Sequence, residues 1–274
     1  MKLISKDHLE KIIREDLKRI LSTDIVFKYS DFDTGLNKIL LQQSLKFSNP
    51  NDFNDPFDSH ENLINIKHDK KLVDEVLRNS ELNSIFKITR KERRKLEKDI
   101  FKKEIYQPIL RKKRNEYKLS CFSAMKDVKL MWSHYADKHQ GMCIGFNFPH
   151  RYDERFLLCP VKYVKKIIPH DGTADIIRTI LYMQTTKTKE WEYEDEIRAI
   201  TIAADKSQSF EIVFYEKKYV REIIFGCKVP NQNITDAIKK LKDNNFDISS
   251  IEFKKMEKDR NTLLLKENKV DYDF

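Results

Sequence analysis

Short segments with the alternation of β-strands recur along the chain, and helical segments separate them at irregular intervals. Residues 44–48 alternate in this way, whereas residues 128–139 repeat apolar side chains at helical spacing. A doubly wound fold would require a regular succession of strand and helix, which this chain lacks. Apolar residues make up 40% of the 274, which is enough to build a core and to exclude a wholly disordered chain. The sequence therefore predicts an α+β fold.

The pattern also predicts how the chain is organised. Strands are expected at residues 24–29, 44–48, 118–123, 141–148, 156–164, 190–202, 210–215, 220–227, 248–253 and 262–265. Helices are expected at residues 3–22, 33–43, 128–139, 175–183 and 234–245. Residues 1–274 are predicted to form a single domain, with an N-terminal helix at 1–22 and a helical, basic insertion at 61–116.

The basic excess of the chain lies in one stretch. Residues 64–118 contain 18 Lys and Arg against 9 Asp and Glu, which equals the net charge of +9 for the whole chain. A phosphate-facing surface would have this composition, because clustered cations bind nucleic acid by releasing its counterions. The solvated face of a helix would have it too, since acidic residues are interleaved with the basic ones. Both interpretations stay open, and a nucleic acid or a protein target is the expected partner of this stretch.

Several classes of protein are excluded by composition. No apolar run reaches the roughly 18 residues that span a bilayer, so no membrane association is expected. The charged N-terminus lacks the apolar core of a signal peptide, which predicts a cytoplasmic protein. The four cysteines form no CxxC pair and are expected to be reduced thiols rather than zinc ligands.

Two polar clusters lie at the ends of predicted strands. Asn54, Asp55 and Asp58 follow residues 44–48, where their side chains either hold turns through their own backbone or bind a metal ion. Ser120 and Ser123 lie near the end of another strand, where their hydroxyls either bond a ligand or cap the next helix. The sequence leaves these alternatives open.

A third cluster lies on the predicted helix at 128–139. Tyr135 and His139 are four residues apart and share a face, whereas His134 and His139 are five apart, which disfavours a zinc pair. A helix that carries Trp, His and Tyr is either a core helix with amphipathic aromatic edges or the wall of a ligand site.

The fourth cluster is an acidic ladder. On a strand over 190–202, Glu192, Glu194, Glu196 and Arg198 would share one face of the sheet. The three carboxylates would then repel one another. In a cleft, this repulsion would raise the pKa of one carboxyl and leave another ionised to stabilise a cation. At an edge, the same charges would protect a solvated strand from aggregation.

Together these clusters resemble a bacterial family, domain-of-unknown-function family 2971. The motifs that carry the resemblance are LKFSNPNDFNDPFD (Leu45–Asp58), SCFS (Ser120–Ser123), LMWSHYADKHQGMCIGF (Leu130–Phe146) and WEYEDEIR (Trp191–Arg198). The resemblance spans roughly residues 25–226 and depends on the order and spacing of these motifs. Residues 61–116 carry no motif of the family.

More remotely, the chain is similar to the ADP-ribosyltransferase fold, a split sheet of mixed and antiparallel strands. That resemblance aligns Lys28 and Tyr29 with a first-strand basic residue that contacts NAD. It aligns Ser120–Ser123 with an aromatic-Ser-x-Ser motif and Glu194–Glu196 with a catalytic Glu-x-Glu motif. The chain departs from the family in having Lys at position 28 and no Thr in SCFS.

The resemblance implies an enzyme that uses NAD as a substrate and needs no metal. Glu196 would be the catalytic carboxylate and Glu194 the one nearest the acceptor. The residues expected to bind NAD are Lys28, Tyr29, Asn54, Ser120, Ser123, His134 and Tyr135. Such folds often serve as bacterial toxins or anti-phage effectors. The alternative is a nucleic-acid-binding protein or metal-dependent nuclease that uses the basic segment, with Glu192, Glu194 and Asp55 around a divalent ion.

Overall fold

The computed structural model describes residues 25–66, 103–148, 152–153, 155–166, 170–172 and 176–272. The chain divides into two compact units, and each is described by itself. The described residues of the first unit come from 49–66, 103–117 and 162–189, and the second unit takes the others. The predicted N-terminal helix at 1–22 and residues 67–102 of the predicted insertion lie outside the described residues.

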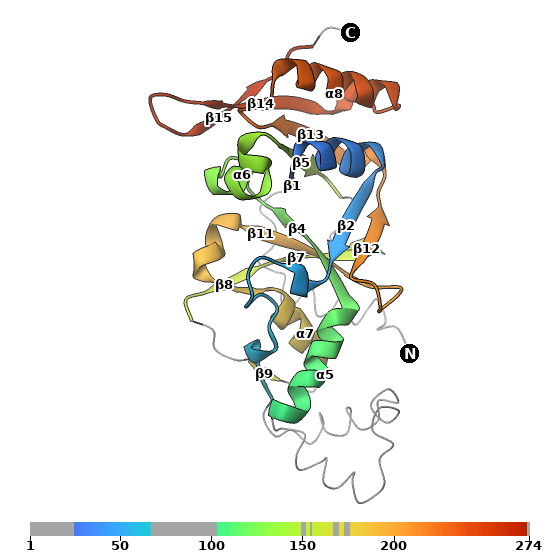
Figure 1. The fold of residues 1–274 in the computed structure, drawn as a ribbon, viewed down its shortest axis with the longest axis vertical. Helices are drawn as coiled ribbons and strands as arrows, with labels where there is room; N and C mark the ends of the chain where they lie inside the picture. Colours follow the sequence, from blue (N-terminus) through green and yellow to red (C-terminus); the bar gives the residue numbers. More distant parts are fainter. Residues whose placement is uncertain are drawn as a thin grey trace, which may run out of the picture. The chain divides into compact units, whose positions relative to one another are not determined.

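The second unit is built on one eleven-stranded sheet (Figure 1). Its strands are β1 (Val26–Ser30), β2 (Ser44–Ser48), β4 (Tyr117–Ser123), β5 (Met142–Phe146), β6 (Tyr152–Asp153), β7 (Phe156–Pro160), β11 (Glu196–Ile202), β12 (Phe210–Phe214), β13 (Val220–Phe225), β14 (Glu252–Lys258) and β15 (Leu265–Lys269). The order is β15-β14-β13-β5-β1-β4-β11-β7-β6, and β2 joins β12 to β4. The sheet is mostly antiparallel, as the pairs of β1 with β5, β7 with β11, and β5 with β13 show. It is mixed because β13 and β14 run parallel. The α+β prediction is therefore confirmed.

Helices cover this sheet. They are η1 (Thr34–Leu41), α6 (Lys129–Tyr135), η4 (Asp137–His139), η5 (Lys189–Glu194), η6 (Lys217–Tyr219), α8 (Asn231–Asp243) and η7 (Ile248–Ser250). In Figure 1, α8 lies along β13 and β14, where its apolar side, including Ile238 and Leu241, joins Phe225 and Phe253 in the main core. Repeats of apolar residues three and four apart give α8 this one-sided burial.

Helix α6 is fixed to β1 by one aromatic pair. The Trp132 side chain is fully buried, and its ring meets that of Tyr29 edge to face, with 5.4 Å between ring centroids. The indole Nε1 donates to the Lys126 carbonyl at 2.8 Å, and the Tyr29 hydroxyl donates to the Met125 carbonyl at 3.0 Å. Both polar tips are thus satisfied while the rings stay dry. This packing holds the turn after β4 and the start of α6 against the sheet.

The first unit contains η2 (Pro50–Asp52), η3 (Glu61–Leu63), β3 (Ile64–Ile66), α5 (Lys103–Glu116), β8 (Lys162–Val164), β9 (His170–Gly172), α7 (Ile176–Gln184) and β10 (Thr186–Thr188). Strands β3 and β9 form one parallel pair, and β8 and β10 form another. Its core packs α5 against α7 through Leu63, Ile64, Tyr106, Leu110, Ile180 and Met183. Within the described residues, none of the helices has the length and apolar character of a membrane crossing.

Several sequence predictions about secondary structure are wrong. Residues 61–66 form no continuous helix: His60 caps a single 3₁₀ turn by accepting from the Asn62 N–H, and the next three residues pair with β9. The predicted strand at 248–253 begins with a 3₁₀ helix, η7, and β14 starts only at Glu252. The predicted strand at 156–164 is two strands of different sheets. It breaks at Val161, whose N–H donates to the Glu196 carbonyl, whereas the Lys162 N–H donates to the Thr185 carbonyl. The pattern of apolar residues does not show which strand a segment pairs with, so it could not reveal the pairing of residues 64–66 or the break at Val161.

Gly141, in the turn between α6 and β5, has no room for a side chain. A Cβ at Gly141 would overlap the main-chain carbonyl oxygen of Ser30, which cannot move without breaking β1. We expect Gly141→Ala to lower the free energy of unfolding by about 3 kcal/mol, near the upper end for overpacking. Chemical denaturation monitored by circular dichroism measures this loss.

Gly35→Ala is the matched control for this variant. Its Cβ would meet only the flexible side chain of Met142, and alanine favours the helical turn around it. We expect a loss of about 1 kcal/mol or less. Equal losses in the two variants would contradict the steric account of Gly141.

Candidate functional site

The three strands that carry the predicted catalytic motifs are immediate neighbours in the sheet, in the order β1-β4-β11 (Figure 1). Lys28 on β1 reaches across to β4, where its Nζ donates to the Ser120 hydroxyl at 3.0 Å and to the Cys121 carbonyl at 2.9 Å. The ammonium also lies 5.3 Å from the centroid of the Phe122 ring. The structure therefore brings Lys28 and Ser120 into direct contact.

A buried ion pair lies on the third of these strands. Arg198 Nε donates to Glu196 Oε1 at 2.9 Å, and Arg198 Nη2 donates to Glu196 Oε2 at 3.0 Å. The two side chains are 0% and 4% exposed, respectively. They meet because residues two apart on a strand share a face, and the planar guanidinium matches both oxygens of the carboxylate. Glu196 is held as an oriented, ionised carboxylate.

Two further groups surround this carboxylate. Burial and the negative charge of Glu196 raise the pKa of the Cys121 thiol, which stays protonated and donates to Glu196. Burial lowers the pKa of the Lys28 ammonium by more than the nearby Glu196 carboxylate raises it. Lys28, Ser120, Cys121, Glu196 and Arg198 form a group that we call the central cluster. Ser120, Glu196 and Arg198 are buried, and Lys28 and Cys121 are half-buried.

The end of β4 is tied to the residues that precede β11. The Ser123 hydroxyl donates to the Glu194 carbonyl at 2.6 Å and accepts from the Met125 N–H at 3.0 Å. The Ala124 N–H donates to the Asp195 carbonyl at 2.9 Å. Ser123 is fully buried, so its hydroxyl positions the acidic segment through protein contacts.

Glu194 is held by an aromatic side chain from α6. The Tyr135 hydroxyl donates to Glu194 Oε1 at 2.6 Å. Tyr135 and Tyr193 are half-buried and pack on a cluster that includes Tyr29 and Trp132. His134 is exposed, and its ring centroid lies 6.2 Å from that of Tyr135. The structure therefore places an oriented carboxylate beside half-buried aromatic rings.

The predicted acidic ladder is wrong in its first half. Residues 189–194 form the 3₁₀ helix η5, in which the Asp195 N–H closes a turn on the Glu192 carbonyl, and β11 begins only at Glu196. Asp195 adopts a left-handed conformation with φ of 39°, which separates the helix from the strand. Glu192 is exposed and Glu194 buried. The three carboxylates therefore do not repel one another across a single sheet face.

Most of the predicted site residues lie together in the second unit. Lys28 contacts Ser120, Ser123 and Tyr135 contact the two ends of Glu194, and Tyr29 packs beneath α6. Asn54 belongs to the first unit and is exposed. Sequence reasoning missed Cys121 as a member of the central cluster, and it named Arg198 without its two hydrogen bonds to Glu196. The Glu-x-Arg spacing was the available signal, because a strand puts both side chains on one face.

The basic run Arg111–Arg114 is not a uniform solvated surface. Arg111 and Arg114 on α5 both pair with Glu61, and Arg114 is buried. Lys113 pairs with Glu116 three residues later. Among the residues that the structure describes, no three His, Cys, Asp or Glu side chains are grouped so that they could hold a metal ion.

Comparison with known proteins identifies one family. Residues 131–199 match the family described as "Protein of unknown function (DUF2971)", which confirms the resemblance predicted from the sequence motifs. The matched segment runs from α6 into β11 and contains Tyr135, Glu194, Glu196 and Arg198. No curated protein and no solved structure matches the chain.

The buried ion pair predicts an asymmetric response to mutation. Glu196→Gln leaves Arg198 as a buried charge without its counter-ion, which costs about 3 kcal/mol of unfolding free energy, at the lower end for a broken buried pair because Gln still accepts one hydrogen bond. Urea denaturation monitored by fluorescence measures this loss. Glu192→Gln removes an equal charge from an exposed position and is expected to cost less than about 0.5 kcal/mol. A wild-type stability for Glu196→Gln would contradict the assignment of this pair.

Proposed function

We propose that the protein binds NAD as a substrate over the central strands β1, β4 and β11 and breaks the bond between nicotinamide and ribose, as ADP-ribosyltransferases and NAD glycohydrolases do. One observation carries the proposal. The strands that bear Lys28, the SCFS motif and the Glu-x-Glu motif are adjacent, and hydrogen bonds link them in pairs. The sequence resemblance supplied the order of the motifs, and their proximity in the fold is independent of it.

The chemistry of Glu196 supports a catalytic role. Loss of nicotinamide builds positive charge on the ribose, and a carboxylate that is already ionised and oriented stabilises this charge without reorganisation. Arg198 supplies both conditions through its two hydrogen bonds. Cys121, protonated because burial raises its pKa, is a hydrogen-bond donor to the carboxylate and not a competing nucleophile.

The cations of the central cluster suit the pyrophosphate of NAD. The half-buried Lys28 ammonium lies close to the Glu196 carboxylate that Arg198 holds. Charge-assisted hydrogen bonds from such an ammonium to phosphate oxygens are strong. Ser120 is 2% exposed and accepts from Lys28, so in this proposal it positions the ammonium.

The surroundings of Glu194 suit the other end of the substrate. Tyr135 and Tyr193 offer half-buried rings on which a nicotinamide ring can stack. The Glu194 carboxylate, oriented by the Tyr135 hydroxyl, would accept the proton of the attacking hydroxyl, amine or water. The bond from the ribose to nicotinamide breaks, the bond from the ribose to the nucleophile forms, and the proton passes to Glu194.

The assignment of two carboxylate roles predicts different losses of NAD consumption. We expect Glu196→Gln to lower the rate of nicotinamide release by about 10²–10³, the usual cost of removing a preorganised electrostatic group. Glu194→Gln should lower transfer and hydrolysis by about 10², as expected for a general base. Glu192→Gln is the exposed control and should consume NAD at the wild-type rate.

Each variant is assayed well below its own melting temperature, because Glu196→Gln is expected to be less stable. Equal turnover by the wild type and the folded Glu196→Gln variant would overturn the catalytic assignment. A wild-type protein that neither binds nor consumes NAD would overturn the proposed function.

The lowered pKa of Lys28 predicts the pH dependence of NAD binding. The protonated amine binds the pyrophosphate, so affinity falls as pH rises through its pKa, and burial moves this fall below the ordinary value of about 10.4. Titration calorimetry at several alkaline pH values measures it. Lys28→Met should bind NAD at least about tenfold more weakly at neutral pH and should lose this pH dependence. A pH profile unchanged in Lys28→Met would contradict the role of this ammonium.

A further inference from the structure

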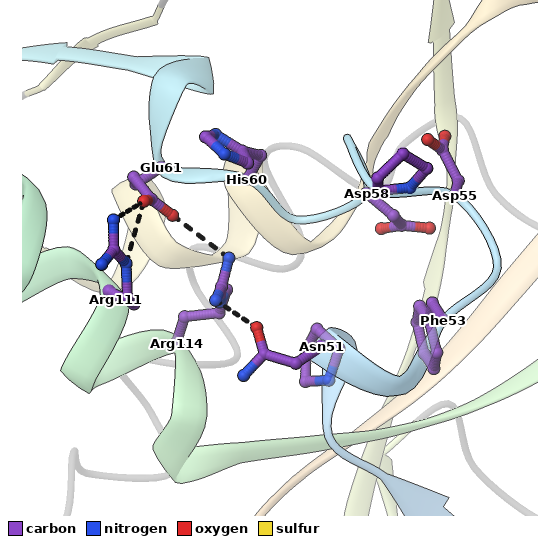
Figure 2. Close-up of a pocket in the computed structure, with 10 residues that line it drawn as sticks. Asn51, Phe53, Asp55, Asp58, His60, Glu61, Arg111 and Arg114 are labelled. Atoms are coloured by element: carbon purple, nitrogen blue, oxygen red, sulfur yellow. Dashed lines mark hydrogen bonds and ion pairs between the residues drawn. The ribbon is translucent and has the colours of Figure 1, made fainter.

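The proposed function leaves a polar cavity of the first unit and a strand edge of the second unit unused. The cavity lies between the loop after β2 and helix α5, where Arg111 and Arg114 both donate to Glu61 (Figure 2). These three side chains already have one another as partners. The strand edge differs, because both its backbone groups and its side chains are open to solvent.

This edge belongs to β12 (Phe210–Phe214). Among the strands that the structure describes, β12 pairs only with β2, antiparallel, and Figure 1 shows the two side by side. The Tyr215 N–H donates to the Gln43 carbonyl at 3.0 Å, so the odd-numbered residues of this strand bond to β2. The N–H and C=O groups of Phe210, Ile212 and Phe214 therefore point away from β2.

Most of these outward groups have no partner. Arg155 donates to the Phe214 carbonyl, whereas no described residue bonds the outward N–H or C=O of Phe210 or Ile212. Edge strands are commonly protected from pairing by a proline, a lysine or a bulge, and β12 contains none of these. A further strand along this edge would satisfy the open groups.

The same three residues form an apolar stripe on the outer face of β12. Phe210, Ile212 and Phe214 are 41%, 39% and 63% exposed, respectively, because alternate side chains of a strand share a face. Val213 points to the opposite face and is buried in the main core. An exposed apolar group of this kind, next to an unpaired strand edge, marks an association surface.

We propose that β12 pairs antiparallel with β12 of a second copy of this chain, around a two-fold axis at Ile212. In this register Ile212 exchanges two backbone hydrogen bonds with its own copy, and Phe210 lies opposite Phe214 of the second copy. All three apolar residues then have an apolar partner across the interface. The Phe214 carbonyl oxygen, which already accepts from Arg155, has a second lone pair for the new strand.

Charge selects this occupant and this register. Arg155 reaches the Phe214 end of β12, and Glu211 lies at the other end, where it accepts one backbone N–H and pairs with no basic side chain of the described residues. Antiparallel pairing brings the Arg155 end of each copy to the Glu211 end of the other. An axis at Glu211 would place that carboxylate opposite itself, and an axis at Val213 would leave Phe210 without an apolar partner.

The oligomeric state of the full chain tests this proposal. A single five-residue strand pair is a small interface, so we expect a monomer–dimer equilibrium with a Kd on the order of 10–100 μM. Sedimentation velocity over a concentration series that spans this range measures it. A two-fold dimer closes on itself, so the series should end at the dimer.

Ile212→Glu is the variant that separates this interface from others. We expect it to weaken association at least about tenfold, because two carboxylates would meet at the axis. The variant should fold, since position 212 lies on the solvent face opposite Lys46 of β2, and thermal melting checks this. Leu264→Glu is the matched control. Leu264 is 57% exposed in the turn before β15, and this variant should dimerise like the wild type.

Single cysteines test the register. Ile212→Cys places two thiols opposite each other at the axis, whereas Phe210→Cys places them four residues apart. A short bifunctional thiol reagent should therefore cross-link Ile212→Cys and a mixture of Phe210→Cys with Phe214→Cys, but not Phe210→Cys alone. The wild type, in which Cys121 and Cys227 are half-buried, gives the background.

Three outcomes would overturn the proposal. The first is a chain that stays monomeric throughout the series, which is also the result expected if β12 takes a strand from a different protein. The second is a dimer that the folded Ile212→Glu variant does not weaken. The third is cross-linking of Phe210→Cys alone as strong as that of Ile212→Cys. None of these results depends on NAD turnover, so the proposal fails or stands apart from the proposed function.

Discussion

The forked pairing of Glu196 with Arg198 is the interaction on which the centre of the sheet depends. Both charges are buried, and each offsets part of the cost of burying the other. Replacing such a pair by apolar residues often costs a fold nothing, so its presence is weak evidence for stability. A carboxylate at the start of β11, close to the Lys28 ammonium, is the group that the proposed reaction would use to stabilise developing positive charge.

The local parts of the fold could be predicted from the sequence. Alternation of apolar residues gave β2 its correct bounds, Ser44–Ser48, because side chains on a half-buried strand repeat every two residues. The Glu196 and Arg198 contact follows from the same period. Two pairs of the predicted site residues, Lys28 with Ser120 and Ser123 with Glu194, are in contact although they come from elements far apart in the sequence.

The other features of the fold and the site depend on tertiary contacts that a single sequence does not reveal. Residues 190–194 alternate like a strand, yet their backbone closes a 3₁₀ turn that ends at the left-handed Asp195. The run Arg111–Arg114 has the composition of a solvated surface, but Glu61, fifty residues earlier, draws Arg114 inward. Both outcomes are decided by tertiary contacts that override local pattern.

The measurement that tests the central claim most directly is a crystal structure of the protein with a non-hydrolysable NAD analogue. The account predicts the analogue over strands β1, β4 and β11, with its pyrophosphate on Lys28 and the ribose carbon that bears nicotinamide facing the Glu196 carboxylate. An analogue bound elsewhere in the second unit, or with its ribose turned away from Glu196, would contradict the account.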